Sequence, residues 1–332
     1  MSARGLAKRI GVLLLTVIAT MIITFLLLRM MPGNIVGNLA RTYASTYAVP
    51  IDQAYQIIAG MIHYNPKQPI DQQFYTYIKG ILHGNLGQSI INTNVSVDQV
   101  IGRALPWTVF TLSISLVVSF LIGINLGSIM AWKRKSILDP IISTYAILST
   151  AVPSFIIAIL LLVFFAFQLA WFPVQGAYGA QETPGFNIPF MLSALYHAVL
   201  PIITYIIASL GGWALSMKGN AVNILGEDYI TAAYIRGVPD SNIMKNYVKK
   251  NALLPLVTSL ALQFGMMIGG STIIESYFSY PGMGYYIGQA TSNRDYPEMQ
   301  GLFLVTAVAV MIANLIADLL YTKLDPRVKL ED

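Results

Sequence analysis

Long apolar stretches alternate with shorter polar ones along the whole chain. Six of the apolar stretches reach about the 20 residues that a helix needs to cross the hydrocarbon core of a bilayer. We place them at residues 10–31, 107–132, 141–168, 193–217, 256–276 and 301–321. The pattern therefore predicts an all-α polytopic membrane protein with six transmembrane helices, in which residues 1–332 form one transmembrane domain.

The composition favours a membrane protein over a soluble one. Hydrophobic residues make up 55% and charged residues 11% of the 332 positions, with a mean hydropathy of +0.63. One soluble core cannot bury that much apolar surface. The net charge of +5 would suit a nucleic-acid partner, but the basic residues lie beside the apolar stretches, where membrane orientation explains them. The chain has no Cys, which excludes disulfides and thiolate metal sites.

The distribution of Lys and Arg predicts the orientation. Fourteen of the 20 lie before the first span, after the second, between Lys218 and Lys250, and in the tail. The positive-inside rule then places both termini and residues 218–255 in the cytoplasm, and makes residues 33–106 a large external insertion. Arg29, at the outer end of the first span, has two interpretations: a side chain that snorkels to the surface, or a gate charge.

Several features inside the spans predict how the helices pack. Small residues recur at every fourth position in two spans, and such stripes let helix backbones approach closely. Pro153 predicts a kink in the third span, either to line a path or to serve packing. The two stripes are Thr111, Ser115, Ser119, Gly123 and Gly127 in the second span, and Ala261, Gly265 and Gly269 in the fifth.

Three polar side chains are candidates for a substrate path: Asn125 in the second span, Gln263 in the fifth, and Glu275 at the outer end of the fifth. A polar group at membrane depth is costly, so it marks either function or helix packing. For Asn125 the alternative is an interhelical hydrogen bond. Glu275 alternatively contacts a partner subunit or caps the helix bundle.

The segment 218–255 is a long polar stretch between two apolar ones. Its spacing predicts a helix over residues 227–236, a stop at Gly237-Val238-Pro239, and a second helix capped by Asp240 and Ser241. The result is a helix-turn-helix elbow exposed to soluble partners. The alternative is an ordinary amphipathic cytoplasmic loop.

The elbow resembles the cytoplasmic EAA loop of ATP-binding-cassette (ABC) importer permeases. The small pair, the glycine four residues later and the Leu-Pro ending of that loop match Ala232, Ala233, Gly237 and Leu253-Leu254-Pro255. Together with Asp228, Tyr229 and Asn251-Ala252, they look like the B-type permeases of the oligopeptide, dipeptide and nickel importers, which have the MetI-like transmembrane fold. Thr231 departs from the general motif, which has Glu there, so Glu227 or Asp228 would supply the acidic group.

Three further segments resemble the same family. They are Gly84-Asn85-Leu86-Gly87-Gln88-Ser89, the pattern Glu-x-x-Phe-x-x-Pro-Gly-x-Gly from Glu275 to Gly284, and the tail Leu324-Asp325-Pro326-Arg327. The first lies in the external insertion, where it would either receive a binding protein or cap the mouth of the pore.

The resemblance implies a multi-pass cell-membrane subunit that moves oligopeptides or dipeptides inward by alternating access. Its implied partners are a second permease, two cytoplasmic ATPases and an external peptide-binding protein, with lipid around them and no nucleic acid. The chain has no nucleotide-binding or hydrolytic motif, so we expect no enzyme activity and no cofactor here, with ATP and Mg on the ATPases. The implied ATPase contacts are Asp228, Tyr229, Ala232, Ala233, Arg236 and Gly237.

Other functions remain open at this point. One is the import of a nickel chelate or another small solute. His63, His83 and His197 are better interpreted as scattered residues than as a metal site, so nickel import stays open only through a bound chelate. Another is an ion-coupled secondary transporter, although its expected paired acidic residues at the midplane are missing, since Glu275 and Asp318 lie near opposite ends. A membrane scaffold without transport would leave the elbow and the small-residue stripes unexplained.

Overall fold

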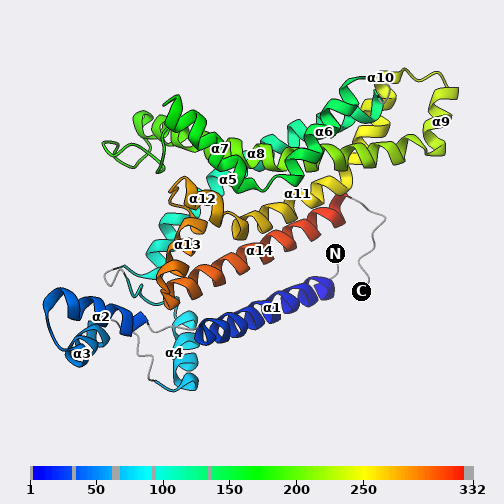
Figure 1. The fold of residues 1–332 in the computed structure, drawn as a ribbon. Coiled ribbons are helices and arrows are strands. Elements are labelled where there is room, and N and C mark those ends of the chain that lie inside the picture. The colour runs from blue at the N-terminus through cyan, green and yellow to red at the C-terminus, as the bar shows by residue number, and fades with distance from the viewer. Residues whose placement is uncertain (1–2, 32–34, 62–67, 92–94, 134–135, 325–332) are drawn as a thin grey trace.

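The protein is built from helices, and its computed structural model describes residues 3–31, 35–61, 68–91, 95–133 and 136–324 (Figure 1). His63 and the tail residues Asp325-Pro326-Arg327, which the sequence analysis names, lie outside these ranges. Within the described ranges the only strand-type pairing is an isolated bridge between Gln88 and Ser96. The all-α prediction is confirmed.

Fourteen α-helices and two π-helical stretches are described. The α-helices are α1 (Ala3–Met30), α2 (Ile35–Tyr47), α3 (Ile51–Met61), α4 (Ile70–Leu82), α5 (Val97–Trp132), α6 (Leu138–Ala151), α7 (Ser154–Leu161), α8 (Ile188–Leu225), α9 (Asp228–Ile235), α10 (Asp240–Asn242), α11 (Lys250–Gly270), α12 (Thr272–Tyr277), α13 (Met283–Asn293) and α14 (Tyr296–Leu324). The π-helical stretches are η1 (Leu162–Gln168), which continues α7, and η2 (Ile243–Lys249), which joins α10 to α11.

Within the described residues, five helical stretches are long and apolar enough to cross a membrane, and a bent pair makes a sixth if it counts as one span. The five are Ala7–Met30, Val97–Trp132, Ile188–Leu225, Asp240–Gly269 and Tyr296–Leu319. In Figure 1, α1 runs beside α14, and α14 runs beside α11. Helices α2 to α4 lie at one end of the bundle, the α4 end, and α9 and α10 lie at the other, the α9 end.

Several helices extend beyond the spans predicted from hydropathy. The second span was predicted from Trp107, but its helix begins at Val97, where the Ser96 hydroxyl accepts a hydrogen bond from the backbone N–H of Gln99. The fourth runs over Ile188–Leu225 instead of 193–217, and the fifth continues a helix that starts at Asp240. Hydropathy reports which residues suit lipid, whereas a helix continues through polar residues until its backbone is capped.

The predicted third span is broken, not kinked. Helices α6 and α7 meet at an angle of 100°. Pro153 has no backbone N–H to donate, and its ring disfavours helical geometry at Val152, which is extended with φ −80° and ψ 121°. The hydroxyls of Ser149 and Thr150 donate to carbonyls one turn earlier, at Ala146, so they do not bridge the break.

The small-residue stripes bring helix backbones together as predicted. A methyl group added at Gly123 would collide with Trp213 of α8, and one at Gly127 would collide with the carbonyl of Ala214. In α11, a methyl group at Gly265 would collide with α14. The pairs α5–α8 and α11–α14 therefore pack closely because these positions carry no larger side chain.

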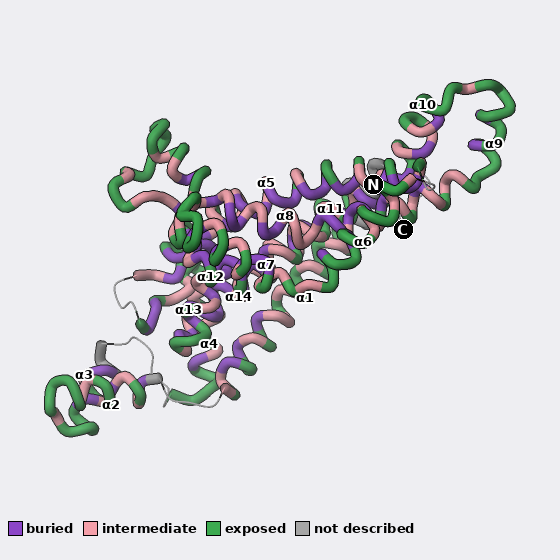
Figure 2. The backbone as a smooth tube through the Cα atoms, turned by 45° about the horizontal axis from the view of Figure 1, so that its top comes forward, coloured by how far each residue is buried: buried purple, intermediate pink, exposed green. Residues whose placement is uncertain are grey.

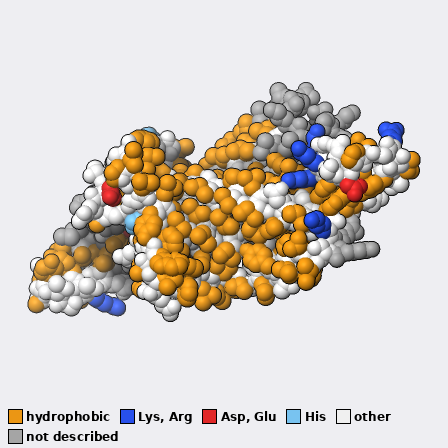
Figure 3. Space-filling model, turned by 90° about the horizontal axis from the view of Figure 1, so that it is seen from above, with side chains coloured by type: hydrophobic (Ala, Val, Ile, Leu, Met, Phe, Trp, Pro, Cys, Tyr) orange, Lys and Arg blue, Asp and Glu red, His pale blue; other side chains and the backbone are white. Residues whose placement is uncertain are grey.

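The burial pattern suits a helix bundle in lipid. Buried residues lie where helices contact one another, and many residues on the outer sides of the helices are exposed (Figure 2). Apolar side chains cover the middle of the face seen in Figure 3, whereas most of the Lys and Arg side chains visible there gather at the α9 end. An apolar belt with a basic end is the distribution that a bilayer imposes.

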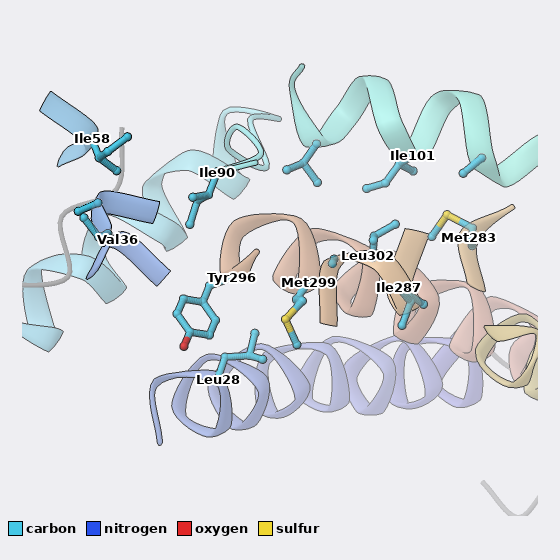
Figure 4. Close-up of a cluster of buried hydrophobic side chains, with 14 of the residues drawn as sticks. Leu28, Val36, Ile58, Ile90, Ile101, Met283, Ile287, Tyr296, Met299 and Leu302 are labelled. Atoms are coloured by element: carbon cyan, nitrogen blue, oxygen red, sulfur yellow. The ribbon is translucent and has the colours of Figure 1, made fainter. Parts of the chain in front are cut away.

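The predicted external insertion packs onto the α4 end of the bundle. A buried apolar cluster includes Leu28 of α1, Val36 of α2, Ile58 of α3, and Tyr296 and Met299 of α14. Figure 4 shows Tyr296 and Met299 lying between α14 and α1, next to Leu28. The insertion is thus tied to the first and last spans through a shared core.

Candidate functional site

The predicted elbow is present. Helix α9 covers Asp228–Ile235, and the chain then turns sharply at Gly237, whose φ of +71° lies in the left-handed region that glycine adopts readily. The N–H of Gly237 donates to the Tyr234 carbonyl at 3.0 Å and that of Val238 to the Ala233 carbonyl at 3.1 Å, which caps the helix.

The start of the second elbow helix differs from the prediction. Pro239 occupies the N-cap position without a side-chain hydrogen bond, and Asp240 and Ser241 lie inside the first turn of α10. The predicted caps at Asp240 and Ser241 are therefore wrong. Proline is well suited to this boundary because its fixed φ fits helix initiation and its missing N–H costs nothing there.

One face of α9 packs against the bundle. Ile230 and Ala233, one turn apart, are buried in a cluster that also contains Ala221 of α8, and Ile243 and Val248 of η2. The small side chain of Ala233 lets α9 lie close to these helices. Of the predicted coupling residues, Ala233 is thus the one that holds α9 to its own subunit.

The other face of α9 is exposed. The predicted coupling residues on this face are Asp228, Tyr229, Ala232, Arg236 and Gly237. Sequence reasoning missed two apolar neighbours, Tyr234 at 46% and Ile235 at 82% exposure. Exposed apolar groups beside charged ones are typical of a protein interface. The available signal was helical geometry. At about 100° per residue, Ile235 lies roughly 160° around the helix from Ala233 and roughly 140° from Ile230, so it cannot share their buried face.

Polar contacts fix the elbow's base to the neighbouring helices. Lys218 of α8 forms an ion pair with Asp139 of α6 at 2.6 Å and donates to Ser143 at 3.2 Å. The side-chain amide of Asn220 donates to the Ala252 carbonyl of α11 at 3.2 Å. These contacts connect the elbow to α6 and α11 as well as to α8.

The structure does not bring the three predicted path residues together. Asn125 is exposed near the α9 end of α5, where its Oδ1 accepts a hydrogen bond from Lys249 of η2 at 2.7 Å. This is the interhelical bond considered as the alternative. Gln263 is half-buried in α11, and Glu275 lies towards the α4 end, so a role in the substrate path stays a prediction for all three.

Glu275 is the centre of a buried turn. Its side chain is fully enclosed, with 1% exposure. Oε1 accepts a hydrogen bond from the Thr108 hydroxyl of α5 at 2.8 Å, while Oε2 accepts from the N–H groups of Gly284 at 2.7 Å and Tyr285 at 3.2 Å. Thr108 in turn accepts a bond from the N–H of Met283 at 2.7 Å.

The two glycines of the Glu-to-Gly motif are explained by this turn. A methyl group at Gly282 would overlap the carboxylate of Glu275 and the hydroxyl of Thr108, and one at Gly284 would overlap the backbone of Thr272. The motif therefore folds its own backbone around the carboxylate. Thr108, which sequence reasoning missed, completes the site from a helix 167 positions away in the chain.

Asp295 similarly explains the motif at Gly84 to Ser89. Its Oδ2 accepts hydrogen bonds from the Ser89 hydroxyl at 2.6 Å and from the N–H groups of Ile90 at 2.8 Å and Ile91 at 3.1 Å. Asp295 is 1% exposed and immediately precedes α14. The segment after α4 is thus anchored to the start of the last span.

The two described histidines make local backbone contacts. His83 and His197 each contact a backbone carbonyl of their own helical segment at 2.8 Å, those of Lys79 and Ser193. In the described part of the chain, no three His, Cys, Asp or Glu side chains are placed to hold a metal ion.

Comparison with known proteins decides the family. Residues 123–330 match the profile of the family described as "Binding-protein-dependent transport system inner membrane component". This region starts in α5 and contains the elbow and the turn around Glu275. The chain belongs to this family. It is a multi-pass membrane transport subunit of an ABC importer, and its family includes peptide permeases.

Three relatives of this transport subunit have related names. A putative peptide permease of Brucella suis is 33% identical over 267 residues, covering 79% of this chain and 81% of that protein. The oligopeptide transport system permease AppB of Bacillus subtilis is 30% identical over 262 residues, 78% of this chain and 81% of that protein. The glutathione transport system permease GsiC of Escherichia coli O6:H1 is 30% identical over 262 residues, 79% and 80% of the two chains.

Proposed function

We propose that this permease moves oligopeptides or dipeptides into the cell by alternating access, as one of two permeases in the transport path. The observation that carries the proposal is the similarity to peptide permeases over about four fifths of the chain, which includes the elbow. The proposed partners are a second permease, two cytoplasmic ATPases and an external peptide-binding protein.

The elbow would couple ATP hydrolysis to the path. Its exposed face, with Tyr229, Ala232, Arg236 and Gly237, would contact a cleft of one ATPase. Closure of the two ATPases would displace α9 as a rigid body, because Ile230 and Ala233 fix it to the bundle. The displacement would then tilt α8 and α11, which enter and leave the elbow.

The proposed orientation places the α9 end in the cytoplasm. The gathering of Lys and Arg there supports this orientation. Arg9 of α1 and Asp318 of α14 form an ion pair at 2.6 Å, so the start of the first span and the end of the last lie on the same side. Both termini would then be cytoplasmic and the α4 end external.

The chemistry of energy supply would reside on the partners. We propose that ATP and Mg bind the ATPase subunits and that this chain carries no cofactor, in keeping with its lack of a phosphate-binding loop. The permease would then contribute the path and the mechanical connection, and it would catalyse no reaction itself.

Affinity purification from the native membrane tests this function. We expect a second permease and two ATPase subunits to co-purify, and the binding protein loaded with peptides to stimulate ATP hydrolysis. Stimulation by nickel chelates with no response to peptides would replace the proposed cargo. A chain that purifies alone, without ATPase activity, would favour ion-coupled transport.

A further inference from the structure

Helix α4 crosses the end of α1 (Figure 1). A cavity with many polar residues in its lining lies between these helices. Its volume is about 230 Å³, and its wall comes from α1, α4, the segment after α4, and the first turn of α14. Phe25 of α1 packs on the rings of Phe74 and Tyr77 of α4, at centroid distances of 5.0 and 5.8 Å. The cavity therefore lies between packed elements, is partly open to the surface, and is separate from the elbow and the Glu275 turn.

The wall of the cavity is rich in hydrogen-bond donors. Gln300, 3% exposed, has an amide nitrogen without a hydrogen-bond partner among the described residues, and the same holds for the hydroxyl of Tyr77. Burial raises the pKa of Tyr77 to about 12 although Arg29 acts against this, so the hydroxyl keeps its proton and remains a donor. Buried donors of this kind normally have a partner.

Arg29 supplies positive charge to the same wall. Its guanidinium lies over the ring of Phe25 at 4.6 Å and near that of Tyr296 at 5.8 Å, and its Nε donates to Gln73 Oε1 at 2.8 Å. Among the described residues that line the cavity, Arg29 is the only charged one. One cation with several donors and no carboxylate is the chemistry of an oxyanion site.

We propose that this cavity binds the phosphate of a phospholipid headgroup. The neighbouring surface of α1 favours a lipid over free phosphate, because Leu26, Leu27 and Met30 expose between 47% and 77% of their surface within one turn of Arg29. Arg29 lies in the last turn of an apolar span, at the depth where headgroup phosphates lie. Acyl chains would follow the apolar surface of α1 while the phosphate enters the cavity.

Lipid titration of the purified full chain, in complex with its partner subunits, tests the proposal. Native mass spectrometry would follow binding of short-chain phosphatidylglycerol, with the matching diacylglycerol, which has no phosphate, as the control lipid. We expect phosphatidylglycerol alone to bind, with inorganic phosphate unable to displace it. Equal binding of the two lipids, binding of inorganic phosphate without lipid, or displacement by peptides would each overturn the lipid assignment.

Matched variants locate the site. Arg29→Gln should weaken phosphatidylglycerol binding at least about tenfold, since charge-assisted hydrogen bonds are the strong ones. Arg41→Gln makes the same substitution at an exposed position of α2 and should leave binding unchanged. If Arg29→Gln fails to fold, Tyr77→Phe removes only a hydroxyl and keeps the ring packing, and it should weaken binding severalfold. Unchanged binding in Tyr77→Phe and Gln300→Leu would overturn the proposal.

Discussion

At the scale of single residues, Glu275 shows what a buried carboxylate does when its motif folds around it. Three donors point at its two oxygens, and the Glu275 side chain itself is only 1% exposed. Removing the carboxylate would leave all three donors without a partner. A buried donor that loses its partner costs the protein stability, because its contact with water is not restored. The side chain therefore stabilises the turn between α12 and α13 whatever else it does.

Glu275→Ala should destabilise the permease by about 3 kcal/mol or more, at roughly 1 kcal/mol or more for each orphaned donor. The measurement is the midpoint of thermal unfolding in detergent, which should fall by several degrees. Glu227→Ala, at an exposed position before α9, is the matched control and should leave the midpoint unchanged. Normal stability with a changed KM for peptide would instead support a substrate contact.

Gly237→Asp should abolish ATP-driven uptake while the subunit still accumulates in the membrane. A side chain at Gly237 meets no atom of its own subunit within 4 Å, and the backbone strain amounts to only about 1 kcal/mol. The loss would therefore arise at the surface that a partner covers. Gly219→Asp adds the same charge at an exposed position of α8 and should transport normally. Normal uptake by Gly237→Asp would contradict the coupling role.

Residues could be predicted from the sequence where the signal is local. Gly237 and Pro239 define the elbow through their own backbones: glycine permits the left-handed conformation of the turn, and proline fixes φ at the start of the next helix. The residues that we predict to couple with the ATPase follow from the same motif. The partner of Glu275 could not be found in this way, because Thr108 reaches it from a different helix and nothing in the residues around Thr108 marks that contact.

At the scale of helices, close backbone approach determines which spans can pair. Helices α5 and α8 approach each other closely at Gly123 and Gly127, where atoms of α8 occupy the space that a side chain would need. Close approach increases the dispersion contacts available to the pair, which matters in lipid because the hydrophobic effect does not drive helices together there.

Gly123→Leu should separate α5 from α8 and lower the amount of folded permease. The added side chain would overlap Trp213, and overpacking of this kind costs about 1–3 kcal/mol or more. Gly102→Leu is the control on the same helix, because a side chain there meets nothing within 4 Å. Membrane yield and thermal stability of the two variants check the prediction, and equal values for both would contradict the packing role of Gly123.

The order of the apolar spans followed from hydropathy, and so did their number if the bent pair counts as one span, but the ends and bends of the helices did not. Val97 begins α5 because of the Ser96 cap, in a stretch whose composition is polar. The 100° break at Pro153 reflects the packing of α6 and α7 against different parts of α8, which hydropathy does not contain. The proline indicated that a change of direction would occur, and tertiary contacts set its size.

At the scale of the whole molecule, the proposed orientation gives a direct labelling experiment. The natural chain has no Cys, so single cysteines can be introduced without removing others. Thr183→Cys, in the exposed segment before α8, should react with a membrane-impermeant maleimide in intact cells. Ser241→Cys, exposed in α10, should react only after permeabilisation. The reverse pattern would invert the proposed topology.

The exposed side chain of Ile235 also has a consequence for biogenesis. A newly inserted subunit would present this isoleucine, together with Tyr234, to the aqueous phase until an ATPase covers them. Apolar side chains displayed in this way are what chaperones and proteases bind on incomplete assemblies. Cellular levels of the permease should therefore follow the supply of its ATPase, so that surplus copies are removed instead of accumulating as idle subunits.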